Sequence, residues 1–563
     1  MEPTINKLLK ELSLIKNSFD SSTNKRKEII ITRLSKTKEF TARQLMDIHE
    51  VLLFLSAHAH SANFLKQVRK VAAMNEAEIK KRLKKGDKAS GRIFHGTGVT
   101  GSHVQAAVSF ELVNWLVKTY PEQVTLDSIG AGAEEACGIV STLLPWQQRE
   151  DFNEGAYASL EDWLDKAVSR NRYQQLNFLL QLLGESSLNN SLRDFLFDQL
   201  EIYIDADLSR IPSRTNLHLD LVSYYYHHEP LIRSIDARTT IQQPLRALPE
   251  SSAAEKEKII TAFRLQLFSL FRETDPGTYA DPNDLKVYDA GRGLSIVLAG
   301  MDKHHRQPID AYIGYMAFKN GQPYSYGGAW MLGPMAKIGI NIFPSYRGGE
   351  SAWFFAQLMR VYYHEFKPAY FIAEPYQVGR HNPEGIETGA FWFYYRLGFR
   401  PVQKKIQQLA TIEFEKLKSG KIKKTPHKIL ETLVEDELVF VPGEQHDAIK
   451  FKYDTHQLSR GIMKYIASRY GGHSHTASKK ATEEICKSLH IAEEEFPKYD
   501  AGLSKLSLYL AAGGGVDGFD KNEKAALKDI ILEKSQGTDS AFAKKAAAHI
   551  ALQKLLLKLA LGR

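Results

Sequence analysis

Cysteine is nearly absent from this chain of 563 residues, since only Cys137 and Cys486 occur, far apart in the sequence. Without a CxxC pair or an evenly spaced set, a disulfide-stapled secreted domain is excluded and a reducing compartment is expected. Long apolar runs are also missing: residues 51–55 fall far short of the ~20 residues of a membrane helix. The first 30 residues contain no apolar core of the signal-peptide type. We therefore expect a cytoplasmic protein without a transmembrane segment.

The composition is that of a globular protein with an uneven distribution of charge. Hydrophobic residues make up 43% and charged residues 25%, which is too apolar for a disordered chain. Residues 1–92 carry 20 Lys and Arg against 10 Asp and Glu, residues 93–400 carry 27 against 35, and residues 401–563 carry 27 against 21. An acidic middle between two basic ends argues against a nucleic-acid groove along the whole chain. Either end remains a candidate for contact with a polyanion, although this is not favoured.

The length indicates several domains, because a domain typically takes roughly 100–200 residues. Residues 1–92 are expected to form a basic helical N-terminal region, in which Thr41 and Gln44 have the spacing of a capping box. Residues 93–250 are expected to form a helical domain, because apolar residues such as those at 176–183 recur in helix-like stripes.

The pattern changes after residue 255, where strand-like segments begin. Asn320 and Gly321 have the composition of a hairpin turn between two of these segments. Strands that first run as hairpins and then alternate with helices indicate a mixed α/β sheet with flanking helices, here over residues 255–405. The expected order is a strand at 293–300, strands at 309–318 and 324–332, a strand at 337–343, a helix at 351–366, a strand at 370–373 and a short helix at 391–396. The fold class expected for the chain is therefore α/β, with this sheet between mainly α-helical N-terminal and C-terminal regions.

Residues 406–563 are expected to form a basic helical C-terminal region. Its last stretch is rich in Ala, Leu and Lys, and its leucines share one helical face, namely Leu552, Leu555, Leu556 and Leu559. A basic amphipathic helix can lie on a membrane, but packing against its own domain is the expectation that we favour.

The chemistry is concentrated in residues 336–401. From Ile340 to Ala352 an apolar strand leads into a glycine-containing turn, and a helix begins directly after it. Such a turn directs backbone N–H groups and the positive end of the helix toward one point, where a phosphate or pyrophosphate can bind. Residues 390–401 follow with an aromatic run that ends in Leu-Gly-Phe.

Together these segments resemble the GNAT superfamily of acyl-CoA N-acyltransferases, over roughly residues 285–402. In that family a strand leads into a pyrophosphate loop of the form Arg/Gln-x-x-Gly-x-Gly/Ala, and a later helix ends in an aromatic-x-x-Leu-Gly-Phe signature. The resemblance implies that the strand before the loop binds the pantetheine arm of CoA and that Tyr394 protonates the departing thiolate. The residues that it assigns to acyl-CoA are Ile340, Ile342, Phe343, Arg347, Gly348, Gly349, Glu350, Ser351 and Ala352.

Glu350 departs from the family pattern, because it stands where the loop normally has glycine. A carboxylate at the start of a helix is favourable in itself, but it competes with a pyrophosphate for the same amide groups. Either its side chain points away from the ligand or CoA binding is weak or absent.

The family offers no fixed position for the general base. Glu374 directly follows the strand at 370–373, and His381 and Glu387 lie on a following loop that is expected to border the substrate pocket. A carboxylate or an imidazole in that place can take the proton of an amine nucleophile. The histidine-containing segments at 58–60 and 227–229 lack further ligands at matching spacing, so no metal site is expected.

The function expected from the resemblance is transfer of an acyl group, here acetyl, from acyl-CoA to an amine by direct attack on the thioester. The acceptor is expected to be an amine-bearing small molecule or protein. Two alternatives remain open. One is a GNAT-like fold that serves as a non-catalytic binding or scaffold module, and the other is a transferase that takes its acyl group from an aminoacyl-tRNA.

Overall fold

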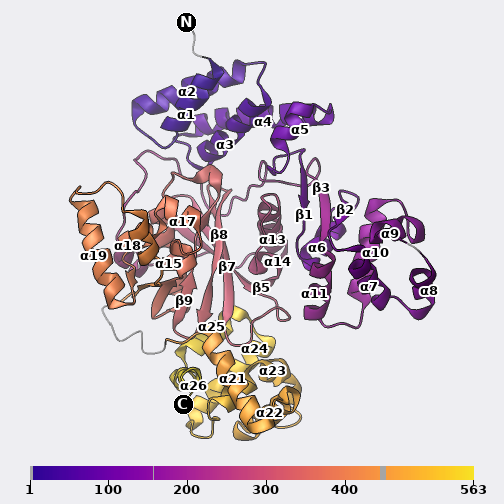
Figure 1. Ribbon diagram of the computed structural model, residues 1–563. Coiled ribbons are helices and arrows are strands. Elements are labelled where there is room, and N and C mark those ends of the chain that lie inside the picture. Colours follow the sequence, from indigo (N-terminus) through magenta and orange to yellow (C-terminus); the bar gives the residue numbers. More distant parts are fainter. Residues whose placement is uncertain (1–3, 156, 444–451, 563) are drawn as a thin grey trace.

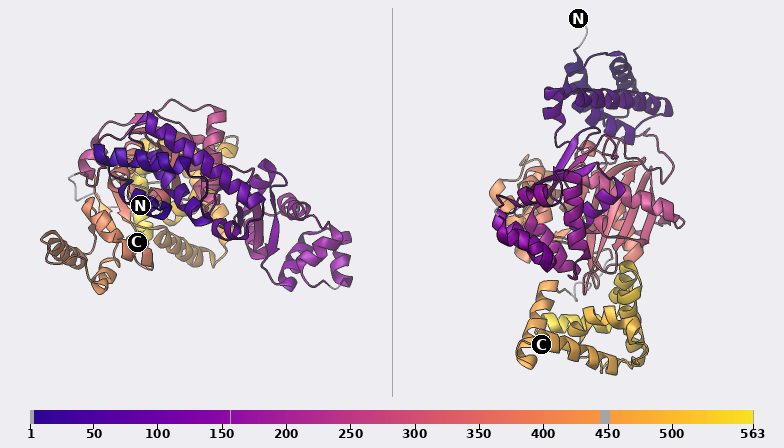
Figure 2. Two further views of the ribbon diagram at one scale, coloured as in Figure 1. Left: turned by 90° about the horizontal axis from the view of Figure 1, so that it is seen from above. Right: turned by 90° about the vertical axis from the view of Figure 1, so that its right-hand side faces the viewer.

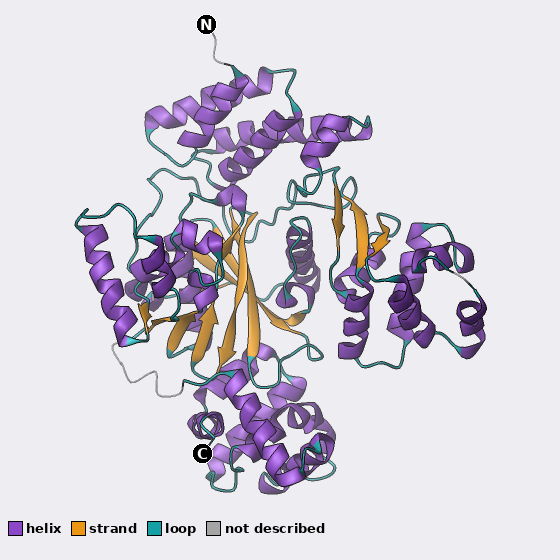
Figure 3. Cartoon of the chain, viewed as in Figure 1, coloured by secondary structure: helices purple, strands orange, loops and turns teal. Residues whose placement is uncertain are grey.

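The computed structural model describes residues 4–155, 157–443 and 452–562. One helical bundle lies at the N-terminal end, a second lies at the C-terminal end, and a large sheet lies between them (Figure 1). A smaller α/β unit projects to one side of the sheet, which is clearest in the view from above (Figure 2). The fold is therefore mixed α/β with two separate sheets, and helices cover most of the surface (Figure 3).

The N-terminal bundle has an apolar core of its own, to which Leu12, Ile31 and Phe64 belong. The predicted capping box is confirmed, because the Thr41 hydroxyl accepts from the Gln44 N–H and the Gln44 side chain accepts from the Thr41 N–H. Its helices are α1 (Ile5–Ile15), α2 (Ser21–Lys36), α3 (Ala42–Ala57), α4 (Ala62–Lys84) and α5 (Lys88–Phe94).

The expectation of a helical domain over residues 93–250 was wrong, because this region contains a three-stranded antiparallel sheet in the order β1-β3-β2. In β3 the side chains of Ile202, Ile204 and Ala206 are buried, while the residues between them are more exposed. This alternation with a period of two is hard to recognise in the sequence of so short a strand. Residues 208–236 contain no helix or strand. The elements of this α/β unit are β1 (His103–Ala106), α6 (Phe110–Thr119), β2 (Val124–Ile129), α7 (Ala133–Leu143), α8 (Trp146–Glu154), α9 (Leu160–Ala167), α10 (Arg172–Glu185), α11 (Asn190–Leu200) and β3 (Ile202–Asp207).

The large sheet has ten strands in the order β12-β13-β11-β9-β8-β7-β6-β5-β4, with β10 paired to β8. It extends beyond the predicted limits of 255–405, because β4 precedes them and β13 comes from the region expected to be helical. Both of these strands are too short to show a periodic pattern. The strands are β4 (Arg246–Ala247), β5 (Ala280–Gly291), β6 (Leu294–Met301), β7 (Ala311–Lys319), β8 (Gln322–Leu332), β9 (Met335–Ile338), β10 (Asn341–Ile342), β11 (Tyr370–Ala373), β12 (Arg400–Pro401) and β13 (Leu438–Phe440).

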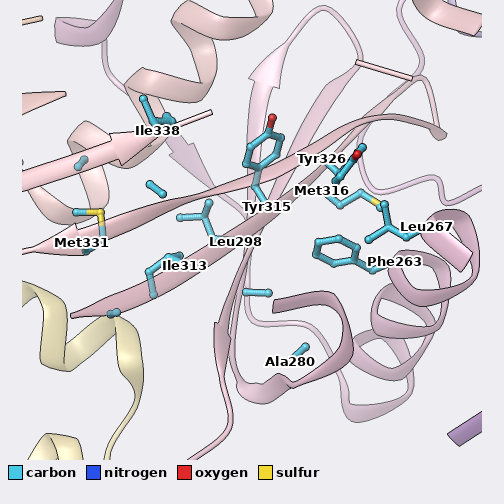
Figure 4. Close-up of a cluster of buried hydrophobic side chains, with 14 of the residues drawn as sticks. Phe263, Leu267, Ala280, Leu298, Ile313, Tyr315, Met316, Tyr326, Met331 and Ile338 are labelled. Carbon is cyan, nitrogen blue, oxygen red and sulfur yellow. The ribbon is translucent and has the colours of Figure 1, made fainter. Parts of the chain in front are cut away.

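Helices cover both faces of the sheet, so its central strands are buried along their whole length, as β6 shows. On one face, α15 (Ser351–Phe366) lies across β7, where the Tyr362 hydroxyl donates to the Ile313 carbonyl at 2.6 Å. On the other face lie α13 (Ala253–Phe268) and α14 (Asp275–Thr278), with side chains of α13 beside Met316 of β7 (Figure 4). At the turn between β7 and β8, Asn320 and Gly321 both have positive φ angles, 48° and 78°, as the predicted hairpin requires.

The remaining helices border the sheet or form the C-terminal bundle. The predicted leucine stripe at the end of the chain is buried within this bundle, which confirms its packing against its own domain. No helix in the described ranges is long and apolar enough to cross a membrane.

The helices beside the sheet are α12 (Ala237–Gln242), the 3-10 turn η1 (Pro344–Tyr346), α16 (Pro375–Val378), α17 (Pro383–Thr388), α18 (Ala390–Arg396), α19 (Lys404–Lys418) and α20 (His427–Leu433). Those of the bundle are α21 (Thr455–Tyr470), α22 (Ser474–Ser488), α23 (Phe496–Ala512), α24 (Lys521–Gln536), α25 (Asp539–Ala548) and α26 (Ile550–Ala560).

Candidate functional site

Two parallel strands separate in the middle of the large sheet. β9 pairs with β11 only from Met335 to Lys337, whereas the chain continues through β10 along β8 in the same register. Gly339 and Phe343 donate their N–H groups to β8, over N–O distances of 3.3 and 3.1 Å. Because alternate residues of an antiparallel strand point to opposite edges, the backbone groups of residues 340 and 342 face away from β8. Among the described residues no strand pairs with this edge, so we call it the open edge of β10.

The segment at 340–343 is anchored by its side chains, and its backbone is paired only on the side of β8. Phe343 is buried and stacks on Tyr326 with ring centroids 5.1 Å apart. Ile340 and Ile342 are half-buried. The three residues that the resemblance assigns to the pantetheine arm therefore lie in the segment that carries the open edge.

The loop after β10 leads directly into α15. It begins with the turn η1, Gly348 has a φ angle of 85° that favours glycine, and α15 begins at Ser351 as expected. Arg347 and Gly348 are exposed, whereas Gly349 is buried. The carbonyls of the two glycines accept hydrogen bonds from Arg233 at 2.8 and 2.9 Å, which holds the loop in place.

Glu350 does not compete for the amides at the start of α15. Its side chain is 2% exposed and forms ion pairs with Arg292 at 2.7 Å and Lys319 at 3.3 Å, and it accepts from the Ile232 N–H at 3.1 Å. It makes no capping hydrogen bond to the helix. Of the two possibilities left open by the sequence, the structure shows the one in which the carboxylate points away from the loop.

The first turn of α15 consequently offers free donors. No hydrogen bond among the described residues uses the N–H groups of Ser351 and Ala352, and the first helical bond runs from the Phe354 N–H to the Glu350 carbonyl at 2.8 Å. The unpaired amides and the helix dipole give this point a positive potential. Beside it, Arg347 forms an ion pair with Glu384 of α17 at 2.7 Å. Both side chains are more than half exposed, so this pair is weak and the guanidinium is available to an anion.

Tyr394 of α18 is buried against α15. Its ring meets those of Phe355 and Phe399 edge-on, at centroid distances of 5.4 Å in each case. Its hydroxyl has no hydrogen-bond partner among the described residues. Burial raises the pKa of this hydroxyl, which therefore stays protonated at neutral pH.

Tyr315 and Tyr394 both pack against the start of α15. The Tyr315 ring lies 6.2 Å from that of Phe354, and the Tyr394 ring lies 5.4 Å from that of Phe355, between centroids. The Tyr315 hydroxyl in turn lies 3.2 Å from that of Ser325 and 3.5 Å from the Gly339 carbonyl. The Tyr315 side chain projects away from the ribbon of its strand (Figure 4). Tyr315 therefore links the start of α15 with the part of the chain between β9 and β10.

Glu374 lines a cavity on the opposite face of the sheet. It forms an ion pair with Lys337 at 2.9 Å, and both residues line a cavity of about 600 Å³ between the sheet and the C-terminal bundle. Trp330 and Asp310 contribute an indole and a carboxylate to the same cavity. Asp310 is only 9% exposed, and burial raises its pKa. The arrangement suits a ligand with a positively charged amine, because carboxylates and an aromatic face both attract cations.

The other two candidates for the general base lie elsewhere. His381 and Glu387 are both exposed, and no hydrogen bond or ion pair among the described residues involves either of them. Neither lines the cavity beside Glu374. Of the three candidates, the structure therefore places only Glu374 in a cavity next to the separating strands.

Several residues of the site were missed at the level of sequence. Arg292 and Lys319, which neutralise Glu350, lie in two different hairpins, and neither has a local sequence signal. Asp310 and Trp330 reach the cavity only because the hairpin strands bring them together. No group of three or more metal-binding side chains occurs in the described part of the chain.

A search of protein-family models, of curated proteins and of solved structures finds no match to the chain.

Proposed function

We propose that the chain is an N-acyltransferase of the GNAT type, which moves an acyl group, here acetyl, from acyl-CoA to an amine. The observation that carries the proposal is the separation of β9–β10 from β11, with a free helix N-terminus at the end of the open strand edge. A thioester with a long amide-containing arm and a pyrophosphate matches this combination of an unpaired edge and an anion site.

In this proposal the pantetheine arm pairs with the backbone groups of residues 340 and 342. The pyrophosphate accepts from the N–H groups of Gly348, Ser351 and Ala352. The N–H groups of Arg347 and Gly349 already donate to the Pro344 and Tyr346 carbonyls, at 3.2 Å in each case. The Glu350 carboxylate takes no part, since it is neutralised by Arg292 and Lys319. Arg347 exchanges its weak pair with Glu384 for a charge-assisted contact with the pyrophosphate.

In this proposal Tyr394 and Glu374 carry the two proton transfers. The amine nitrogen attacks the thioester carbon, and the carbon–sulfur bond breaks as the tetrahedral intermediate collapses. Tyr394 donates its proton to the departing thiolate, and the amine gives up its own proton to Glu374, directly or through water. The Tyr394 hydroxyl is buried and has no partner of its own, which supports the role of proton donor to a group that arrives with the substrate.

The acceptor enters from the face that carries Glu374. The cavity between the sheet and the C-terminal bundle has room for a small cationic amine or for a lysine side chain, and Asp310 and Trp330 provide its contacts. The donor and the acceptor then meet from opposite faces at the point where the two strands separate.

Isothermal titration with acetyl-CoA tests the proposal. Ser351→Glu places a carboxylate beside the free amides of α15, so acetyl-CoA binding is expected to be lost, whereas Ser351→Gln adds the same bulk without charge and is expected to retain it. Absence of binding to the wild-type protein at millimolar acetyl-CoA would refute the acyltransferase and leave the scaffold alternative. RNA that co-purifies and binds with a strong dependence on salt would favour the aminoacyl-tRNA alternative instead.

A further inference from the structure

A lysine lines the cavity between the sheet and the C-terminal bundle, which we call the acceptor cavity. Of the described lysines only Lys337 lines it, and the chemistry proposed above does not use this residue. Its Nζ lies 2.9 Å from Oε1 of Glu374. The Lys337 side chain is 27% exposed and that of Glu374 is 46% exposed, so both groups can be reached from the cavity.

Lys337 also lies at the point where β9 and β11 separate. It is the last residue of β9 that pairs with β11, opposite Ile372, and Glu374 directly follows β11. The chain continues from Lys337 into the segment that carries the open edge of β10. Two neighbouring strands therefore hold the ammonium and the carboxylate side by side at the start of the gap between them.

The direction of the proposed donor brings its thioester toward Lys337. The pyrophosphate lies at the start of α15, and the pantetheine arm runs from there along residues 342 and 340 toward β9. The thioester is at the far end of this arm, beyond residue 340. Because a strand advances about 3.3 Å per residue, Lys337 lies only about 10 Å farther along the chain. The end of the arm and an extended lysine side chain cover that distance together.

The contact with Glu374 makes Lys337 a competent nucleophile. An ammonium must lose a proton before its nitrogen can attack a thioester, and a carboxylate within hydrogen-bonding distance can take that proton. Glu374 is the only ion-pair partner of Lys337 among the described residues. The residue pair therefore contains both an amine and its base before any external acceptor arrives.

On the basis of the function proposed above, we propose that Lys337 is a self-acylation site, which is modified by the acyl-CoA bound to its own chain. Glu374 takes one proton of the ammonium, and the Lys337 nitrogen attacks the thioester carbon. As the carbon–sulfur bond breaks, Tyr394 donates its proton to the thiolate, and the second proton of the nitrogen restores the phenol. The products are CoA and an N-acyl lysine.

Acylation changes the charge of the acceptor cavity. As an ammonium, Lys337 occupies the Glu374 carboxylate and repels a cationic acceptor, whereas as an amide it does neither. Glu374 is then free for the ammonium of the next amine that enters. The acylated chain is therefore the form that binds a cationic acceptor more tightly.

Incubation with acetyl-CoA without any amine acceptor, followed by mass spectrometry of proteolytic peptides, tests the proposal. Lys337 is expected to gain an acetyl group at least about tenfold faster than Lys421, an exposed lysine without an ion pair among the described residues, which reports the uncatalysed reaction. Glu374→Gln is expected to slow Lys337 to this uncatalysed rate. Glu435→Gln breaks an exposed ion pair outside the cavity, with Arg380 at 3.2 Å, and is expected to leave the rate unchanged.

Two substitutions of Lys337 test the effect on the acceptor cavity. Lys337→Gln resembles the acylated lysine in its neutral amide, whereas Lys337→Arg retains the charge. Isothermal titration uses n-butylamine, which has the charge and length of a lysine side chain. The glutamine variant is expected to bind it at least about tenfold more tightly, because a like charge is removed from the cavity. Equal affinity of the two variants would overturn the effect of acylation on the cavity.

Failure of this inference is distinguishable from failure of the proposed function. If acetyl-CoA binds in titration calorimetry but Lys337 is modified no faster than Lys421, self-acylation is overturned and the acyltransferase stands. Unchanged modification in the Glu374 variant, or an equal loss in the Glu435 control, would overturn the role of the Glu374 contact in this step. Absence of acetyl-CoA binding would refute both proposals.

Discussion

Tyr394 is the residue whose proposed role is simplest to isolate, because its hydroxyl has no hydrogen-bond partner among the described residues. Tyr394→Phe removes the proton donor and retains the ring that packs against Phe355. We expect kcat for CoA release to fall about a hundredfold, the usual contribution of a positioned acid. The unfolding midpoint is expected to stay the same or rise, since a buried hydroxyl without a partner is lost. An unchanged kcat in the folded variant would remove Tyr394 from the mechanism.

Glu350 has a structural role that follows from its two buried partners. Glu350→Gln leaves the buried Lys319 without a carboxylate and leaves Arg292 only its longer pair with Glu229 at 3.8 Å, so the free energy of unfolding in urea is expected to fall by about 3 kcal/mol. Glu384→Gln breaks the exposed pair with Arg347 and is expected to cost less than about 1 kcal/mol. An equal fall in the free energy of unfolding in the two variants would show that the buried ion pairs do not hold the loop.

At the level of the element, the open edge of β10 makes a prediction about one backbone N–H group. Ile342→Pro removes the N–H that faces away from β8 and leaves the ladder to β8 intact, so the fold is expected to persist. Acetyl-CoA affinity is expected to fall about tenfold through loss of one hydrogen bond. Ile342→Val is the matched control, with unchanged affinity in titration calorimetry. Full affinity in the proline variant would show that the edge does not bind the pantetheine arm.

The elements differ in how far the sequence predicts them. The helix at 351–366 and the strand at 370–373 match α15 and β11 residue for residue, because a long apolar stripe and a short apolar run are both local signals. β1, β2 and β3 were missed, since strands of four to six residues between helices give no clear period. β13 was missed because only pairing with β11 and β12, far away in the sequence, makes it a strand.

The candidate site, too, could be predicted from the sequence only where its features depend on local signals. Its backbone features, the open edge and the free helix start, follow from a motif that the sequence displays. The direction of the Glu350 side chain could not be predicted, because Lys319 and Arg292 reach it from separate hairpins.

For the whole molecule, the junction between the N-terminal bundle and the sheet contains two buried histidines. His58 ends α3, and its ring lies 5.0 Å from that of His227. Burial lowers the pKa of both residues, and neighbouring cations lower it further. The positive groups that act on them are Lys16, Lys27, Arg292 and Lys319.

The junction should therefore lose stability in acid. Below the unfolded pKa of about 6.5 the unfolded chain binds protons that the folded chain rejects, so stability falls as the pH drops. The expected slope is up to about 1.4 kcal/mol per pH unit for each histidine. Urea unfolding between pH 6.5 and 5 measures it, and His58→Gln is expected to reduce the slope. A wild-type stability that is flat over this range would contradict the prediction.

The central claim is that acyl-CoA binds along β10 and at the start of α15. Hydrogen–deuterium exchange with and without acetyl-CoA tests it most directly, because the amides of residues 340, 342, 348, 351 and 352 would become hydrogen-bonded to the ligand. The account predicts slower exchange in peptides that cover residues 339–353 and unchanged exchange in peptides from α22. Unchanged exchange in residues 339–353 at saturating acetyl-CoA, or protection confined to another part of the chain, would contradict it.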